Sequence, residues 1–328
     1  MSTVTTTTLS AEMKTFYDMR LIDEASPMLV HEQFGQKRPI PQGGGKTVNF
    51  RRFSPLAKAT TALTEGVTPS GSSLSVSNIS AIVAQYGDYV VQSDVLELTA
   101  VDNTILETTK LLGRQAGLTM DTIVRNALLL GTNKSYAPKY VADTNGNLVE
   151  TEVTKTADLD TSAKLTVDVV QRVVAKLRAQ NAPTIGGDYV CIIHPYVAYD
   201  LMRDPEWIDA HKYATPENLY TGEIGKMAGV RFVQSTEAKI DKGGSDNPSG
   251  LAVFHCLFIG DGAYGVTEVT GGGLQTIVKQ KGSSGTADPL DQRSSVGWKG
   301  LKAAKILVDN YLVDLMCCSK FSATATAN

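Results

Sequence analysis

The sequence has few of the residues that usually build catalytic or metal sites. It contains four histidines and four cysteines among 328 residues, and neither type forms a cluster. The cysteines, Cys191, Cys256, Cys317 and Cys318, include no C-x-x-C pair, and a disulfide between the adjacent last two would be strained. A zinc site needs clustered spacing. We therefore expect no metal, and four buried, reduced thiols that suit a cytoplasmic origin.

Long apolar runs and an excess of one charge are also lacking. No apolar stretch approaches the roughly 20 residues that cross a bilayer. The Thr-rich beginning, MSTVTTTTLS, lacks the basic and apolar regions of a secretory signal. A net charge of −3 excludes a chain that is basic throughout in order to grip nucleic acid. These absences predict a protein with no membrane contact. The length of 328 residues is enough for two or three packed regions.

One short motif, GGGKT at residues 43–47, resembles the end of a nucleotide-binding loop. That loop needs a further glycine five residues before its Gly-Lys pair, and this sequence has Ile40 there. The preceding residues hold two prolines and no apolar strand, and the following ones alternate like a strand instead of opening a helix. We interpret the glycines as a hinge between an N-terminal arm and a β-hairpin, and we expect no cofactor.

No other catalytic arrangement is present in the sequence. The nucleophile elbow G-x-S-x-G of serine hydrolases is absent. His255 and Cys256 are neighbours in a predicted strand, so their side chains point to opposite faces. The stretch 143–147 lacks the glycine and glutamate positions of a calcium-binding EF-hand loop, which favours an Asn-Gly hairpin turn. The sequence therefore predicts no enzyme, and no catalytic, cofactor-binding or metal-binding residues.

The most informative segment is residues 47–93, which read as a long two-stranded β-hairpin. Alternating apolar residues flank a turn-rich centre, LTEGVTPSGSSLSVS, at residues 63–77. An isolated two-stranded ribbon is marginally stable in water, and its open edges invite pairing with other chains. Because this ribbon has few large apolar groups near its tip, we expect it to rest on another copy of the same protein.

A long helix over residues 101–130 follows, with apolar residues at spacings of three, four and seven. Its predicted buried face consists of Val101, Ile105, Leu112, Ala116, Met120, Ile123, Ala127 and Leu130. Gly113 and Gly117 lie within this helix. They indicate either the close approach of a neighbouring backbone or a bend.

The remainder mixes strands and helices without regular β-α-β alternation. Helices are expected at 10–23, 167–180 and 195–202, and strands at 189–193, 230–235, 251–259 and 274–281. The segment 302–319 reads as two buried strands that turn at residues 309–310. This arrangement predicts an α+β chain instead of a doubly wound one.

The order of these pieces, together with six short motifs, resembles the major capsid proteins of tailed bacteriophages. The motifs are LTEGVTP (63–69), QYGDYVVQSD (85–94), LTAVDNTILE (98–107), GRQAGLTMD (113–121), GEIGKMAGVRF (222–232) and DQRSSVGWKG (291–300). They are similar in type and order to those of the N-four-type major capsid protein family, which has the Hong Kong 97-type fold. The similarity runs from about residue 10 to residue 319.

The resemblance implies a division of the chain by position in a shell. The implied parts are an N-terminal arm (1–46), an extended β-hairpin loop (47–93), a peripheral domain (94–184) with its spine helix (101–130), an axial domain (185–300), and C-terminal strands with a tail (301–328). In the family the extended loop lies over the adjacent subunit, and the arm grips neighbouring subunits. The expected inter-subunit contacts are Arg51, Arg52, Leu63, Glu65, Val67, Pro69 and Asp88. The two arginines are expected either to pair with Glu65 or Asp88 of a neighbour or to stay solvated.

The resemblance further implies a structural function. The chain would be a major capsid (head) protein that self-assembles into hexamers and pentamers, which form an icosahedral shell around packaged double-stranded DNA. Its expected partners are itself, portal, scaffolding and decoration proteins, and non-specifically held DNA. Its expected location is the virion capsid, assembled in the bacterial host cytoplasm. An alternative with the same fold is the shell of an encapsulin-like cellular nanocompartment, which carries enzyme cargo instead of a genome.

Overall fold

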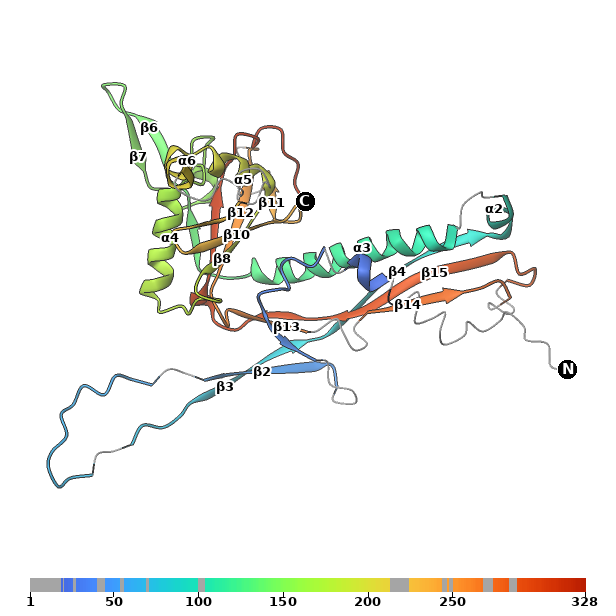
Figure 1. Ribbon diagram of the computed structural model, residues 1–328, viewed down its shortest axis with the longest axis horizontal. Helices are drawn as coiled ribbons and strands as arrows, with labels where there is room; N and C mark the ends of the chain where they lie inside the picture. The colour runs from blue at the N-terminus through green and yellow to red at the C-terminus, as the bar shows by residue number, and fades with distance from the viewer. Residues whose placement is uncertain are drawn as a thin grey trace.

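The computed structural model of the chain describes residues 19, 21–25, 28–39, 45–53, 56–68, 71–99, 104–212, 224–243, 247, 250–267, 274–282 and 288–328. A long helix and a three-stranded sheet run side by side away from a globular lobe, and a thin ribbon projects from their junction (Figure 1). Most of the predicted helix at 10–23 and the first three residues of the predicted helix at 101–130 lie outside the described residues.

The lobe is built on a seven-stranded mixed sheet with the order β5-β17-β12-β8-β10-β9, in which β11 pairs with β12. Its strands are β5 (Lys134–Tyr136), β8 (Tyr189–Ile193), β9 (Lys226–Met227), β10 (Val230–Gln234), β11 (Ile240–Lys242), β12 (Ala252–Ile259) and β17 (Leu312–Cys317). Every residue of β8, β12 and β17 is buried. Such continuous burial is typical of strands whose sheet is covered on both faces.

Helices supply the two covers of this sheet. On one face lie α4 (Val167–Ala179), α5 (Pro195–Met202) and α6 (Pro205–Lys212). On the other face, Val124 and Leu128 from the end of the long helix pack against β8 and β12. The predicted start of α4 is confirmed, because the Thr166 side chain accepts a hydrogen bond from the Val169 N–H at 3.4 Å.

The long helix α3 (Thr104–Leu128) lies along an antiparallel sheet of order β14-β15-β4. The strands of this sheet are β14 (Leu274–Lys279), β15 (Arg293–Lys302) and β4 (Ala84–Ser93), and the short helix α2 (Asp94–Thr99) follows β4. The predicted buried residues Leu112, Ala116 and Met120 do face the sheet. From there the buried stripe continues at four-residue spacing through Val124 and Leu128. The predicted continuation to Leu130 is wrong, since that side chain is 78% exposed.

The N-terminal segment packs against its own chain. Leu21 and Ala25 lie in a helical turn and are buried on α3. A Cβ atom added to Gly117 would lie 2.6 Å from the carbonyl oxygen of Ala25, and one added to Gly113 would lie 3.0 Å from that of Leu21. The two glycines therefore permit a close backbone approach, which confirms one of the two interpretations of their spacing.

Two adjacent residues of this segment bind buried side chains of the body. The Nδ1 atom of His31 lies 2.6 Å from the Asp121 carboxylate of α3, and both side chains are fully buried. The backbone N–H of His31 also donates to Asp121, at 2.7 Å. Glu32 pairs with Lys302 of β15 at 2.5 Å. Burial lowers the pKa of Lys302, and the nearby Glu32 charge opposes that shift.

A small sheet completes the anchoring of the arm. In it, β1 (Gln36–Arg38) pairs in parallel with β13 (Tyr264–Thr267), whose other edge pairs with β16 (Ala304–Ile306). The predicted arm is therefore held on its own subunit at residues 21–25 and 28–38.

The segment predicted as one hairpin, residues 47–93, forms two different structures. The strands β2 (Thr47–Phe53) and β3 (Val76–Ile82) make an antiparallel ribbon. In contrast, β4 leaves the ribbon and pairs over its whole length with β15. The base of the ribbon is anchored too, because Phe50 is fully buried with its ring directly over Gly265. The prediction that the whole segment lacks support from its own chain is therefore wrong for β4 and for the ribbon base.

The C-terminal segment forms two strands that turn near residues 309–310, as predicted, although only the second strand is fully buried. β16 lies in the small sheet, whereas β17 lies between β5 and β12 in the lobe, and the 3₁₀ turn Asp309–Tyr311 separates them. The two strands therefore do not pair with each other. The sheets join segments that are distant in sequence, and the residue boundaries given for the arm, peripheral and axial parts stay predictions about a shell.

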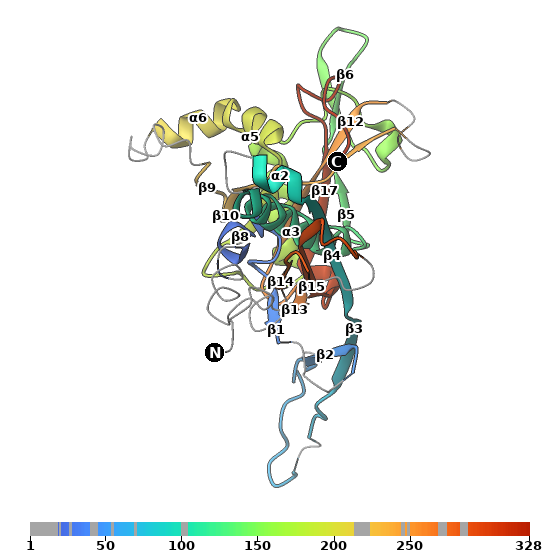
Figure 2. The ribbon, with the colours of Figure 1, turned by 90° about the vertical axis from the view of Figure 1, so that its right-hand side faces the viewer.

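A short hairpin projects from the lobe, at the end of the molecule opposite to the ribbon (Figures 1 and 2). Its strands are β6 (Lys139–Ala142) and β7 (Leu148–Thr151), and the 3₁₀ turn Thr156–Asp158 follows them. The Asp143 side chain closes the tip by accepting the backbone N–H groups of Asn145 and Asn147. Gly146 adopts a positive φ of 82°, so the predicted Asn-Gly turn is confirmed.

The four cysteines are buried and free, as the sequence predicts. Burial raises the pKa of Cys191 well above its usual value and that of Cys318 to about 12. The Sγ atoms of Cys256 and Cys317 lie 3.6 Å apart. Thiols that are held neutral in this way are poor nucleophiles.

His255 is a buried cation within the lobe. Its Nδ1 lies 2.9 Å from Asp314, and its Nε2 lies 2.9 Å from Asp241. Burial alone lowers the pKa of His255, but the hydrogen bonds and charges of the two carboxylates outweigh burial and raise the pKa to about 9. The hydrogen bond from His255 lowers the pKa of Asp241 to about 2.

This histidine predicts a stability that declines in alkaline solution. Its folded pKa of about 9 exceeds the reference value of 6.5, so its contribution is complete below pH 6.5 and is lost as the pH rises through 9. We expect the unfolding free energy of unassembled subunits, measured by urea denaturation, to fall by up to ~1.4 kcal/mol per pH unit in this window. The His255→Gln variant should lack this slope. A variant with the same slope as the wild type would show that another group causes it.

Candidate functional site

The loop between β2 and β3 exposes aliphatic side chains along its whole described length. Residues 56–68 and 71–75 are all exposed. The large apolar members are Leu56, Leu63, Val67 and Leu74, with 59, 78, 63 and 64% of their surface exposed. Burying such a side chain fully is worth about 1.5–3 kcal/mol. A row of them on an extended loop indicates a surface that is covered by a partner.

The described members of the predicted contact set lie on three elements, which are the exposed loop, β2 and β4. Leu63, Glu65 and Val67 lie on the exposed loop, and Arg51 and Arg52 lie on β2. The guanidinium of Arg52 donates to the carbonyl oxygen of Leu307 in its own chain, at 3.4 Å. Pro69 lies outside the described residues.

Asp88 lies on β4, away from the ribbon, and it has partners in its own chain. Its carboxylate accepts hydrogen bonds from the Gln115 side chain at 2.6 Å and from the Tyr89 N–H at 2.8 Å. The hydrogen bond from Gln115 is the main cause of the lowered pKa of Asp88. Gln115 is itself fixed, because the indole N–H of Trp298 donates to it at 3.2 Å.

Gln115 also lines an apolar groove between α3 and β4 that the sequence reasoning missed. The groove has a volume of about 530 Å³. Its lining residues are Tyr86, Leu111, Arg114, Gln115, Leu118, Thr119, Thr122 and Ile123. Leu111 is 67% exposed. A signal for this groove was present in the sequence, because Leu111 and Leu118 are seven residues apart and form a second apolar stripe on the helix.

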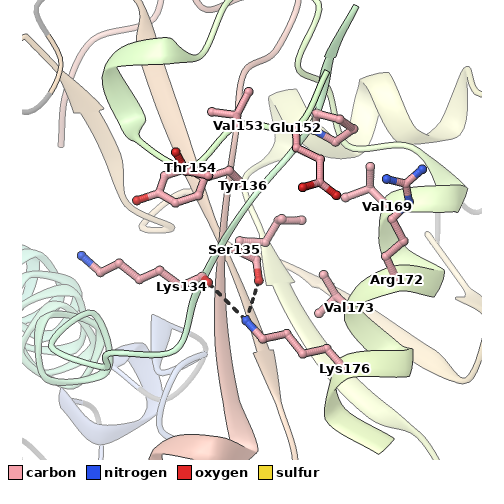
Figure 3. A pocket seen from close by; sticks show the side chains of 12 residues that line it. Lys134, Ser135, Tyr136, Glu152, Val153, Thr154, Val169, Arg172, Val173 and Lys176 are labelled. Atoms are coloured by element: carbon pink, nitrogen blue, oxygen red, sulfur yellow. Dashed lines mark hydrogen bonds between the residues drawn. The ribbon is translucent and has the colours of Figure 1, made fainter. Parts of the chain in front are cut away.

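A second groove lies in the lobe between β5 and α4 (Figure 3). Its volume is about 430 Å³, and its apolar lining includes Val153, Val169, Val173 and Leu315. The Lys176 ammonium points across it and donates to the carbonyl oxygen of Lys134 at 3.2 Å and to the hydroxyl of Ser135 at 2.9 Å. Burial lowers the pKa of Lys176.

The chemistry of both grooves suits contacts with protein. The groove in the lobe combines aliphatic side chains with four charged ones, the groove on α3 has one charged residue, Arg114, and neither lining includes a cysteine or histidine. Among the described residues, no three His, Cys, Asp or Glu side chains are grouped so that they would hold a metal ion. Within the same residues, no helix combines the length and the hydropathy needed to cross a membrane.

Comparison with known proteins points to one family. The sequence profile described as "Phage capsid protein" matches residues 77–312. A search of curated protein sequences finds no match. The fold is similar to the capsid of Ralstonia phage GP4, with a TM-score of 0.65, 17% identity, and coverage of 88% of this chain and 87% of that one.

Two further structures show the same fold. The cyanophage Pam1 capsid gives a TM-score of 0.64 at 14% identity and covers 99% of this chain and 97% of that one. The head of Helicobacter pylori bacteriophage KHP40 gives 0.63 at 13% identity, with 86% and 88% covered. These matches confirm the predicted mixed α and β fold of Hong Kong 97 type, and they give no support to the nanocompartment alternative.

Proposed function

The chain belongs to the phage capsid protein family, and from this premise we propose how its surfaces build a shell. It is a structural protein of the virion capsid, not an enzyme, and it assembles with copies of itself. We propose that these copies form hexamers and pentamers of an icosahedral head around double-stranded DNA, assembled in the host cytoplasm. Portal, scaffolding and decoration proteins are the proposed further partners.

The exposed loop between β2 and β3 is the observation that carries this proposal. Its aliphatic side chains have no cover on their own subunit, although the ribbon base is fixed. The groove on α3 offers a complementary surface, with Leu111 exposed and Leu118 in its lining. We propose that the loop of one subunit lies over the α3 and β4 surface of the next. Each such contact is weak, but many simultaneous contacts retain a subunit strongly.

Charge supports the same arrangement. A net charge of −3 on 328 residues produces little repulsion between identical subunits. We propose that Arg51 and Arg52 lie at the subunit boundary and pair with acidic groups of a neighbour such as Glu65. We propose other bounds for the two parts than the resemblance implies: the peripheral part is α3 with its three-stranded sheet, and the axial part is the lobe, which includes β5 and α4. The DNA is held without base-specific contacts.

The proposal predicts that the purified full-length chain forms rings, tubes or shells. Light scattering at increasing protein concentration should show large particles, and negative-stain electron microscopy should show their shape. Nucleic acid extracted from particles made in infected cells would separate a phage head from a cargo compartment. A compact monomer that persists at high protein concentration would contradict the proposal.

A further inference from the structure

The β6–β7 hairpin carries aliphatic side chains that its own subunit leaves uncovered. Val141, Leu148 and Val149 are 46, 71 and 49% exposed. Among the described residues, the two strands pair only with each other. A two-stranded hairpin is marginally stable in water by itself. Valine and leucine on such a hairpin therefore indicate a surface that is covered in the assembled protein.

The hairpin is nevertheless rigidly placed. Both terminal guanidinium nitrogens of Arg172, on α4, bind the Glu150 carboxylate, the second at 3.0 Å. At the tip, the Oδ1 atom of Asp143 accepts hydrogen bonds from the backbone N–H groups of Asn145 and Asn147. These hydrogen bonds hold the exposed Asp143 carboxylate in place on a preformed turn. A preorganised tip loses little conformational entropy when it binds a partner.

The groove between β5 and α4 is complementary to this tip. Its floor is aliphatic, like the exposed side chains of the hairpin. Lys176 crosses it and uses two of its three N–H donors within its own chain, so one donor remains for a carboxylate. Glu152 also lines the groove, and Figure 3 shows its carboxylate turned toward the same space. An incoming acidic group would therefore bind on the Lys176 side of the groove.

The hairpin tip is too far from the groove of its own subunit to fill it. From Asn147 at the tip to Glu152 at the groove, the extended chain rises by about 17 Å, at ~3.4 Å per residue. A contact between tip and groove therefore requires two copies. It joins different surfaces of the two subunits, which is the kind of contact that closes a ring.

We propose that the β6–β7 tip of each subunit docks into the β5–α4 groove of the next subunit around the capsomer ring. In this contact the Asp143 carboxylate meets the Lys176 ammonium, and Leu148 and Val149 cover the aliphatic floor. The inference rests on the proposed shell function. In a ring of six, the distance between neighbouring grooves equals the distance of each groove from the ring axis. Because the hairpin reaches about 17 Å and must span from one groove to the next, each groove lies about 17 Å from the axis.

A disulfide trap tests the contact in the full-length chain. Asn145→Cys places a thiol at the tip, and Thr154→Cys places one in the groove lining. The native cysteines are buried, and the strand β7 separates the tip from the groove of the same chain by more than the roughly 7 Å that a disulfide can bridge. Treatment of the assembled double variant with diamide should give a ladder of linked chains up to six on a non-reducing gel. Each single variant should give at most dimers.

A second measurement tests the apolar part of the contact. Leu148→Ser should raise the subunit concentration required for ring formation by about tenfold. Leu290→Ser is the matched control, because Leu290 is similarly exposed, at 75%, but lies elsewhere on the surface. An equal effect of both variants would overturn the proposal.

The outcomes separate the docking from the shell function. A ladder supports the docking whether or not shells close. Shells of the double variant without a ladder would overturn the docking and leave the shell function intact. Monomers that give neither particles nor a ladder would overturn both.

Discussion

Subunits that lack residues 63–73 are expected to fold normally but to form no closed shells. The described residues of this loop are exposed, so their removal takes no contact away from the subunit. It does remove Leu63 and Val67, which we propose to bind the next subunit. Because each contact is repeated around the shell, the yield of closed particles should fall by about a hundredfold or more. Electron microscopy counts the particles, and circular dichroism with thermal melting checks the fold.

A length-matched variant is the control for this deletion. Replacing residues 63–73 with glycine and serine keeps the reach of the loop and removes its side chains. We expect this variant to fail as well, because the aliphatic groups supply the binding energy. Normal shells from the deletion variant would show that the loop does not clamp neighbouring subunits together.

Loss of the Asp121 carboxylate is expected to give the largest effect on subunit stability. The change Asp121→Ala leaves the His31 ring and its backbone N–H buried without their partner. Each buried hydrogen-bonding group that is left without a partner destabilises a protein by about 1–3 kcal/mol, and this change leaves two such groups. Urea denaturation of the unassembled variant measures this loss. Trypsin should also cleave faster after Lys37, because the segment that holds β1 is loosened.

Asp121→Asn is the matched control. Its side-chain oxygen still accepts the His31 N–H, so it should lose less stability than the alanine variant. A loss below about 1 kcal/mol in Asp121→Ala would mean that the pair does not anchor the N-terminal segment.

Local patterns in the sequence predict the lobe well. The strands β8 and β12 appear where continuous apolar runs predict them. The helix α4 begins after its predicted Thr cap, and α5 begins at its predicted proline. The long helix is also predicted, but the residues that form the buried face of its last turns differ from the predicted ones. Periodicity locates an apolar stripe, yet Val124 and Leu128 are buried because β8 and β12 lie against that end of the helix. This partner is not encoded by local spacing.

Strand partners are the main feature that the sequence leaves open. The alternation of apolar and polar residues in 84–93 is compatible with a hairpin ribbon. It is equally compatible with a sheet that pairs this strand with one about two hundred residues later. Only the distant β15, with Gly297 beside Tyr89, decides between them. The arm shows the same limit. Its sequence predicts an arm that grips neighbouring subunits, because the groups that bind His31 and Glu32 on its own subunit, Asp121 and Lys302, come from far along the chain.

The functional surfaces were predicted in part. The exposure of Leu63 and Val67 follows from a turn-rich segment with too few apolar partners, and the structure confirms that they are exposed. The interaction of Asp88 with Gln115 and the two grooves depend on side chains from different elements. Such surfaces appear only after the strands have been paired.

The connection between β3 and β4 has a mechanical consequence. β3 ends at Ile82 and β4 begins at Ala84, so a single residue, Val83, separates the free ribbon from a strand that is bonded along ten residues to β15. The connection has no flexible linker, and the backbone N–H of Val83 donates a hydrogen bond of 2.8 Å to the carbonyl oxygen of Lys46. A force that a neighbouring subunit exerts on the loop tip is therefore transmitted through the ribbon directly to the three-stranded sheet under α3. Internal pressure on the head would be shared between subunits as tension along backbone instead of being absorbed by a flexible hinge.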